Sequence, residues 1–205
     1  MRPIQFDYTP ADADTNGYAA GVTAASGDPF TLTATTPGDG LAHPVIITPS
    51  GSVTGTYTIT GVDADGYAQT EDLATNTTNA VTSVEAYATV TEVLAPSGLG
   101  AETVDIGWTA VSYGPAFLLN WRQVNFQVSL GVIVSGTINY TVQHTLDNMR
   151  TGTVPSALTW FPHASLASKT ATADGNYASP VTATRLKVNS LTAGATLTFQ
   201  IVQGR

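Results

Sequence analysis

The chain has 205 residues, of which 11% are charged against about 25% in a typical globular domain, and it carries a formal net charge of −8. It contains no cysteine, which excludes disulfides, thiolate metal sites and cysteine nucleophiles, and it contains no run of ~18 apolar residues typical of a membrane helix. The N-terminus lacks the apolar stretch of a signal peptide, so we expect a protein that is made and folded in a cytoplasm and does not enter a membrane.

Residues 1–28 are rich in Ala, Gly, Asp and Thr and show little periodicity, which predicts an extended N-terminal arm. Phe6 and Tyr8 are the candidate anchors of this arm, and we expect them to contact a neighbouring subunit. The alternative interpretation is a disordered terminus.

Within this arm, Asp12, Asp14 and Asn16 place three oxygen-bearing side chains at alternate positions before a glycine, which matches the opening of a calcium-binding loop. The twelfth position of that loop is Thr23 rather than Glu, and no helical pattern flanks the segment. A polar turn therefore explains these residues better than a metal site.

From Phe30 to Trp108 the sequence consists of short segments of alternating polarity, separated by turns rich in Gly, Pro and Asp. In one such segment Val53, Tyr57 and Ile59 share a face, and threonines occupy the other. Residues 62–67 follow it and predict a hairpin turn, with Gly66 at a position of positive φ. This pattern predicts an acidic β-domain over residues 29–110.

Residues 109–120 contain Gly114-Pro115 and predict a boundary, followed by a mildly basic β-domain over residues 111–205. Its clearest alternation lies in residues 125–146, where a Ser-Gly turn predicts a long hairpin, and residues 185–202 repeat this design. The whole chain therefore predicts an all-β fold: an antiparallel β-sandwich or jelly roll, built as two β-subdomains with the N-terminal arm.

Charge is distributed unevenly along the chain. Residues 1–110 hold 13 of the 15 acidic residues and one basic residue, whereas residues 111–205 hold two acidic and six basic residues, so the halves carry −12 and +4. An acidic half argues against nucleic-acid binding there. Two interpretations stay open: the acidity only keeps that half soluble, or the two halves face different partners, such as the opposite half of a neighbouring subunit.

The sequence contains no phosphate-binding glycine loop, nucleophile elbow or zinc-protease pattern, and none of its three histidines lies at metal-ligand spacing from another. We therefore expect no catalytic residue, no cofactor and no enzyme activity. Trp160, Phe161 and His163 form an aromatic cluster in a long connection, which is either a contact patch or a plug over the core. Arg122, Arg185 and Lys187 are the basic residues expected to face an acidic partner.

Two stretches resemble proteins of tailed-bacteriophage particles. The first runs over residues 56–71 and continues to 81–84; the second runs over residues 140–147, 160–163, 180–188 and 199–203. The resemblance implies a virion structural protein, either a capsid decoration (cement) protein or a minor head protein. It also implies that the partners are the major capsid protein or other virion proteins and further copies of this chain, in a homo-oligomer such as a trimer.

Two alternative functions remain open. One is a head–tail connector, ring or fibre-base component. The other is a receptor- or carbohydrate-binding β-module, in which Tyr67, Tyr87, Trp160 and Tyr177 would stack on sugars.

Overall fold

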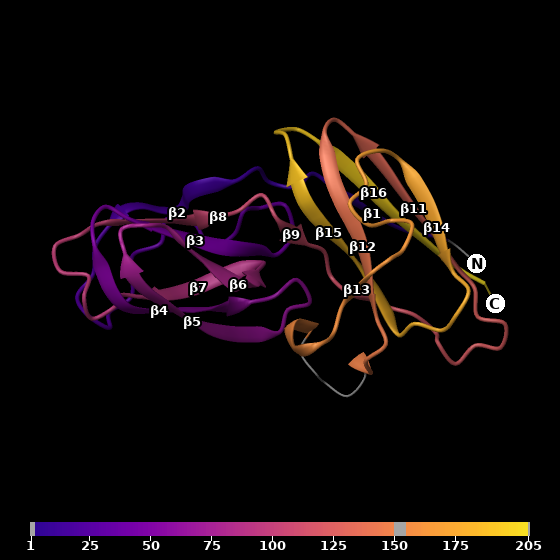
Figure 1. Cartoon of the computed structure of the whole chain (residues 1–205), viewed down its shortest axis with the longest axis horizontal. Helices are drawn as coiled ribbons and strands as arrows, with labels where there is room; N and C mark the ends of the chain where they lie inside the picture. The colour runs from indigo at the N-terminus through magenta and orange to yellow at the C-terminus, as the bar shows by residue number, and fades with distance from the viewer. Residues whose placement is uncertain (1–2, 150–154, 205) are drawn as a thin grey trace. The chain divides into compact units, whose positions relative to one another are not determined.

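The computed structural model describes residues 3–149 and 155–204, and its regular secondary structure is almost entirely β-strand (Figure 1). The predicted all-β, sandwich-like fold of antiparallel sheets is confirmed. The chain divides into two compact units, each with its own hydrophobic core. We call residues 11–112 the acidic unit, and residues 1–10 with residues 113–205 the basic unit.

The acidic unit is a sandwich of a four-stranded and a three-stranded sheet. The strands of the first, in spatial order, are β2 (Asp14–Val22), β8 (Val104–Trp108), β3 (His43–Pro49) and β6 (Val81–Tyr87). Those of the second are β5 (Ala68–Thr77), β4 (Val53–Val62) and β7 (Thr89–Leu94).

Strand β4 shows why this part of the chain forms strands. Val53, Tyr57 and Ile59 are fully buried, whereas the threonines between them lie on the outer face, as period-two alternation requires. The predicted turn after β4 is confirmed: β4 and β5 form a hairpin, and Asp63 Oδ1 accepts the backbone N–H of Tyr67 at 2.9 Å. Gly66 has φ +82° in this turn, a conformation that favours glycine.

The basic unit is also a sandwich of two sheets. One contains, in spatial order, β1 (Ile4–Tyr8), β16 (Thr196–Gln203), β11 (Val128–Ser135) and β14 (Ala173–Tyr177). The other contains β10 (Phe117–Leu118), β15 (Ala183–Leu191), β12 (Ile138–Thr145) and β13 (Phe161–Pro162), and β9 (Ser112–Tyr113) also pairs with β15. The 3-10 helix η2 (Pro155–Ala157) lies in the connection before β13.

The two hairpins predicted in this unit are wrong. Strand β11 pairs with β14 and β16, whereas β12 pairs with β13 and β15, so the Ser135-Gly136 turn carries the chain from one sheet to the other. The turn between β15 and β16 makes the same crossing, and Thr192 donates its N–H to Thr137 O at 2.9 Å between the two turns. Alternation shows only which side of a strand is buried. Two strands paired within one sheet and two strands that face each other across a core have the same alternation, so the pattern does not tell these arrangements apart.

The structure also differs from the expected arm over residues 1–28. Strand β1 pairs with β16 from Ile4↔Ile201 to Tyr8↔Leu197, and β2 pairs with β8 in the acidic unit. The boundaries fall after residues 10 and 112 rather than after 28 and 110, so the acidic unit is inserted between β1 and the rest of the basic unit. A five-residue strand whose partner lies at the other end of the chain leaves little local signal.

Charge segregates between the units more completely than between the halves of the sequence. The acidic unit contains twelve acidic residues and neither Lys nor Arg, a formal charge of −12. The basic unit contains three acidic and seven basic residues, a charge of +4, and the two sum to the −8 of the chain.

Phe6 contributes to the core of its own unit, because its ring centroid lies 6.2 Å from those of Tyr8 and Phe117. We predict that Phe6→Ala destabilises the basic unit by about 2 kcal/mol through lost burial. Hydrogen exchange should then accelerate in β16 and β11 and stay unchanged in β3 and β4. Unchanged exchange in β16 would instead support an arm that packs on another subunit.

Candidate functional site

One outer sheet surface of the basic unit gathers aromatic and basic side chains, and we call it the basic face: Tyr113, Trp160, Arg185 and Lys187. Strand β15 places its two basic residues there, because Leu186 and Val188 alternate with them and point into the core. The sequence singled out three of these four residues, and the structure brings them together with Tyr113.

Arg185 lies at the centre of the basic face, where it contacts two aromatic rings and Gln143. Its Cζ lies 4.0 Å from the ring centroid of Trp160 and 4.9 Å from that of Tyr113, within the range of cation–π interactions. Its Nε donates a hydrogen bond to Gln143 Oε1 at 2.9 Å. These contacts order the guanidinium group on the outer side of β15.

The rest of the basic face is ordered in a similar way. Lys187 Nζ lies 5.3 Å from the ring centroid of Tyr113, and Trp160 Nε1 donates to Pro155 O at 2.9 Å. Next to Lys187 along β15, Asn189 Nδ2 donates to Asn139 Oδ1 at 2.7 Å. The basic face therefore carries two basic side chains supported by aromatic rings and several ordered hydrogen-bonding groups.

The third predicted basic residue lies elsewhere in the basic unit, in the loop of residues 120–126. Arg122 Cζ lies 4.8 Å from the Trp121 ring centroid, and Val124 is 82% exposed. The side chain of Gln203 fixes the start of the loop by accepting the N–H of Asn120 at 3.0 Å and donating to its carbonyl at 3.1 Å. The loop presents Arg and Trp, two residue types enriched at protein interfaces, beside an exposed apolar side chain.

His163 is a plug over the core rather than part of a contact patch. The residue is 6% exposed, and its Nε2 lies 3.2 Å from Asn176 O in the opposite sheet. Its Nδ1 accepts the backbone N–H of Ser165 at 3.2 Å, so Nε2 carries the proton. A side chain at Gly175 would lie 2.8 Å from the His163 ring, which explains the glycine there. Phe161, by contrast, is 44% exposed.

His144 lies beside this plug. Its ring centroid is 5.1 Å from that of Tyr177, which in turn lies 4.9 Å from His163. Burial lowers the pKa of His144, and its electrostatic interaction with the neighbouring His163 lowers it further. Burial raises the pKa of Tyr177 to about 12, so the tyrosine is neutral near neutral pH.

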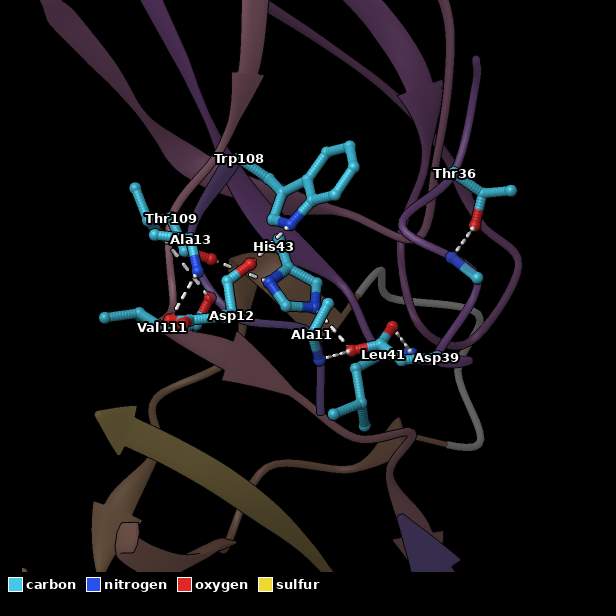
Figure 2. A network of polar contacts seen from close by, with 11 residues as sticks. Ala11, Asp12, Ala13, Thr36, Asp39, Leu41, His43, Trp108, Thr109 and Val111 are labelled. Atoms are coloured by element: carbon cyan, nitrogen blue, oxygen red, sulfur yellow. Dashed lines mark hydrogen bonds and ion pairs between the residues drawn. The ribbon is translucent and has the colours of Figure 1, made fainter. Parts of the chain in front are cut away.

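The most buried polar network of the acidic unit joins His43 and Asp39 (Figure 2). His43 is fully buried; its Nε2 lies 2.8 Å from Asp39 Oδ2 and its Nδ1 lies 2.8 Å from Thr109 O. Thr109 O and the ionised Asp39 carboxylate are both acceptors, so each ring N–H of His43 has a hydrogen-bond partner.

The same network fastens the start of the acidic unit. Asp39 Oδ2 also accepts the N–H of Ala11 at 2.7 Å, and Oδ1 accepts the N–H of Leu41 at 3.0 Å. Burial acts to raise the pKa of Asp39, but the hydrogen bonds that its carboxylate accepts, first from His43, lower it below its usual value. Trp108 Nε1 donates to Asp12 O at 2.9 Å beside this network (Figure 2).

The calcium-loop candidates do not form a wrapped loop. Asp14 and Asn16 belong to the extended strand β2, and Asp14 Oδ1 accepts the N–H of Asn16 at 3.1 Å. Asp12 Oδ1 accepts the N–H of Ala13 at 2.9 Å. Among the residues that the structure describes, no group of three or more His, Asp or Glu side chains is arranged to hold a metal ion.

The remaining residues predicted from the sequence lie at the following positions. Phe6 and Tyr8 pack against the core of the basic unit. Of the tyrosines proposed to stack on sugars, Tyr87 is fully buried and Tyr177 is 6% exposed, which leaves Tyr67 and Trp160 at the surface. No helix in the described part of the chain is long and apolar enough to cross a membrane.

The sequence did not single out Asp39, Gln143 or Tyr113. An Asp four residues before a His in a Gly-rich turn, as at Asp39 and His43, was the available signal for the buried pair. Nothing local marks Tyr113 or Gln143, because their roles arise from strand pairing with β15.

A comparison of the chain with protein-family models, curated proteins and solved structures finds no match.

We predict that Asp39→Asn destabilises the acidic unit by about 3 kcal/mol, in the range for breaking a buried ion pair. The introduced Asn side chain has only one acceptor oxygen. One of the N–H groups that now donate to the Asp39 carboxylate would therefore face the NH₂ group of the amide. Asp28→Asn, at an exposed acid of the same unit, is the control and should change little. Denaturant unfolding, followed by hydrogen exchange over residues 11–112, measures both.

The same pair of proteins tests the pKa of Asp39. A lowered folded-state pKa stabilises the fold above the unfolded value of 3.8, and this contribution is lost as pH falls through the folded pKa. The stability difference between the native protein and Asp39→Asn should therefore shrink below about pH 4. A difference that stays constant to pH 2 would contradict the ionised carboxylate.

For His144, the lowered folded pKa means that the unfolded chain binds a proton more readily below about pH 6.5. We predict that the basic unit loses stability as pH falls below that value and that His144→Phe reduces the slope. Hydrogen exchange over residues 125–204 between pH 7 and pH 5, compared between the native protein and His144→Phe, gives the measurement. Equal slopes in both proteins would assign the pH dependence to another group.

Proposed function

We propose that this chain is a non-enzymatic structural protein of a tailed-phage virion, a decoration (cement) protein that docks on the capsid shell and stabilises it. The observation that carries the proposal is the segregation of charge between two separately cored β-sandwiches, −12 in one and +4 in the other. A polarised subunit of this kind suits orientation between partners of opposite charge. The resemblance of residues 56–84 and 140–203 to virion proteins supports the same class.

The docking element that the geometry favours is the loop of residues 120–126. Arg122 stacked on Trp121 offers a cation on an aromatic support, and the 82%-exposed Val124 offers apolar surface that a partner can bury. The partner in this proposal is an acidic surface of the major capsid protein or of another virion protein. The mechanical role is to bridge shell subunits against the outward pressure of packaged DNA.

Copy number distinguishes this role from a head–tail ring or fibre-base component, as symmetry allows roughly a dozen copies or fewer in a ring and hundreds on a head. The observations favour the receptor- or carbohydrate-binding function less, because only two of the four aromatic residues proposed to stack on sugars are accessible.

We predict that the chain binds emptied, undecorated heads and that this affinity falls at least tenfold between 50 and 500 mM NaCl, because screening weakens contacts between exposed charges. Arg122→Gln should weaken binding several-fold at low salt. Lys169→Gln removes an exposed charge from the same unit outside the loop and serves as the control.

Co-sedimentation with heads measures both effects. Absence of binding at 50 mM NaCl would overturn the decoration role. Binding with equal affinity at both salt concentrations and in Arg122→Gln would overturn docking by charge through this loop.

A further inference from the structure

We propose that the segment of residues 161–166, which we call the strap, opens locally from the basic unit when His163 takes up a proton in mildly acidic solution. The strap begins with β13 and closes the side of the sandwich between β12 and β14. This inference concerns the basic unit by itself, so it does not depend on the proposed docking to a head.

The strap is bonded to both sheets of the basic unit. On one side, His163 donates its backbone N–H to Val142 O at 2.8 Å, and Val142 donates its N–H to Leu166 O at 2.9 Å. On the other side, His163 Nε2 lies 3.2 Å from Asn176 O in β14. A side chain at Gly175 would come within 3.0 Å of Leu166, so the strap packs directly on the backbone of β14.

These contacts require a neutral His163. Its Nε2 donates to Asn176 O, and its Nδ1 accepts the backbone N–H of Ser165 at 3.2 Å. A proton on Nδ1 places two donors against each other, and this hydrogen bond is lost. Ser165 Oγ, 3.3 Å from Nδ1, can accept the new N–H, but the backbone N–H of Ser165 still loses the acceptor that it has in the closed strap.

The nearest titratable groups do not compensate for a positive charge on His163. Strand β12 places His144 nearby, and β14 places the Tyr177 ring between the two histidines, 5.1 Å from one and 4.9 Å from the other. Burial keeps Tyr177 neutral, with its pKa raised to about 12. A protonated His144 would repel a protonated His163, so acid disfavours the closed strap at both histidines.

The other charged groups of the surrounding elements lie away from His163. Asp174 of β14 is exposed, because it alternates with the inward residues of that strand. Asp147, beyond the end of β12, accepts the N–H of Thr159 at 2.7 Å, and Lys169 is exposed after the strap. No Asp or Glu within residues 3–149 and 155–204 forms an ion pair with His163. A charged His163, 6% exposed in the closed strap, is therefore accommodated better by solvent.

The backbone just after the strap also favours opening. Ser168 has φ +52°, in the left-handed region that favours glycine, and its N–H donates to Thr141 Oγ1 at 2.9 Å. A non-glycine residue keeps this conformation only while its surroundings impose it. Ser168 is therefore a suitable hinge, because release of the strap also relieves strain there.

Opening changes what the basic unit displays. Leu166 is fully buried and Tyr177 is 6% exposed while the strap is closed, and both are uncovered when it leaves. The edge of β12 then presents the unpaired N–H and C=O of Val142, the kind of edge to which another strand can add. Proton uptake thus converts a closed side of the sandwich into an open one.

Hydrogen exchange of single amides, measured by NMR on the full chain at pH 7 and pH 5 and corrected for intrinsic exchange rates, tests the proposal. The amides of Val142, His163 and Leu166 report on the strap, because each donates to a partner that opening removes. We expect their protection to fall at least tenfold more than that of amides in β11 and β16. The ¹³C shift of the His163 ring should titrate with the same midpoint as this loss.

Two variants assign the effect to one residue. His163→Gln keeps one donor and one acceptor but takes up no proton, so the strap should be equally protected at both pH values. His144→Phe is the matched control; it removes the other histidine and should retain the selective loss at the strap. Near-UV circular dichroism checks that both variants are folded, and the titration of the native chain tests the proposal independently of them.

Four outcomes would overturn the proposal. In the native chain these are strap protection that does not change between pH 7 and pH 5, an equal loss in β11 and β16, as global destabilisation produces, or a His163 titration at a different pH from the opening. In the variants, the decisive contrary result is a pH-dependent loss that persists in folded His163→Gln or disappears in His144→Phe.

Discussion

One-sided burial of alternating strands is the constraint on which the rest of this structure depends. Each long strand sends every second side chain into one of two cores, as Val53, Tyr57 and Ile59 do in β4 and as Leu186 and Val188 do in β15. The intervening side chains must then lie outside, whatever their chemistry. The threonines of β4 and the basic residues of β15 are therefore displayed on flat sheet surfaces by the same alternation that builds the cores.

A second constraint is that the basic unit is closed by strands from opposite ends of the chain. Strand β1 pairs with β16, while the acidic unit is inserted directly after β1. The buried network of His43 and Asp39 holds the first residue of the inserted unit through the N–H of Ala11. Polar burial of this kind is costly unless every donor and acceptor is paired, so it fixes one arrangement of the loops around it.

The charge pattern gains a physical meaning once the units are known. The acidic unit contains neither Lys nor Arg, so its carboxylates repel one another, and apart from Asp39, which pairs with His43, they have no basic side chain of Lys or Arg within the unit. The basic unit contains few basic side chains, but Arg122, Arg185 and Lys187 each lie against an aromatic ring. Our proposal on shell docking follows from this contrast.

The sequence by itself determined the buried sides of long strands such as β4, β11, β12, β15 and β16, the 63–67 turn and the separation of charge, because period-two burial, turn glycines and formal charges are local properties of the chain. Only the tertiary structure decided that β11 and β12 lie in different sheets, that Ile4–Tyr8 completes a sheet with the C-terminal strand, and that Tyr113 and Gln143 hold Arg185. Alternation specifies the buried side of a strand but not its neighbour, since the choice of neighbour depends on how two whole sheets pack across a core.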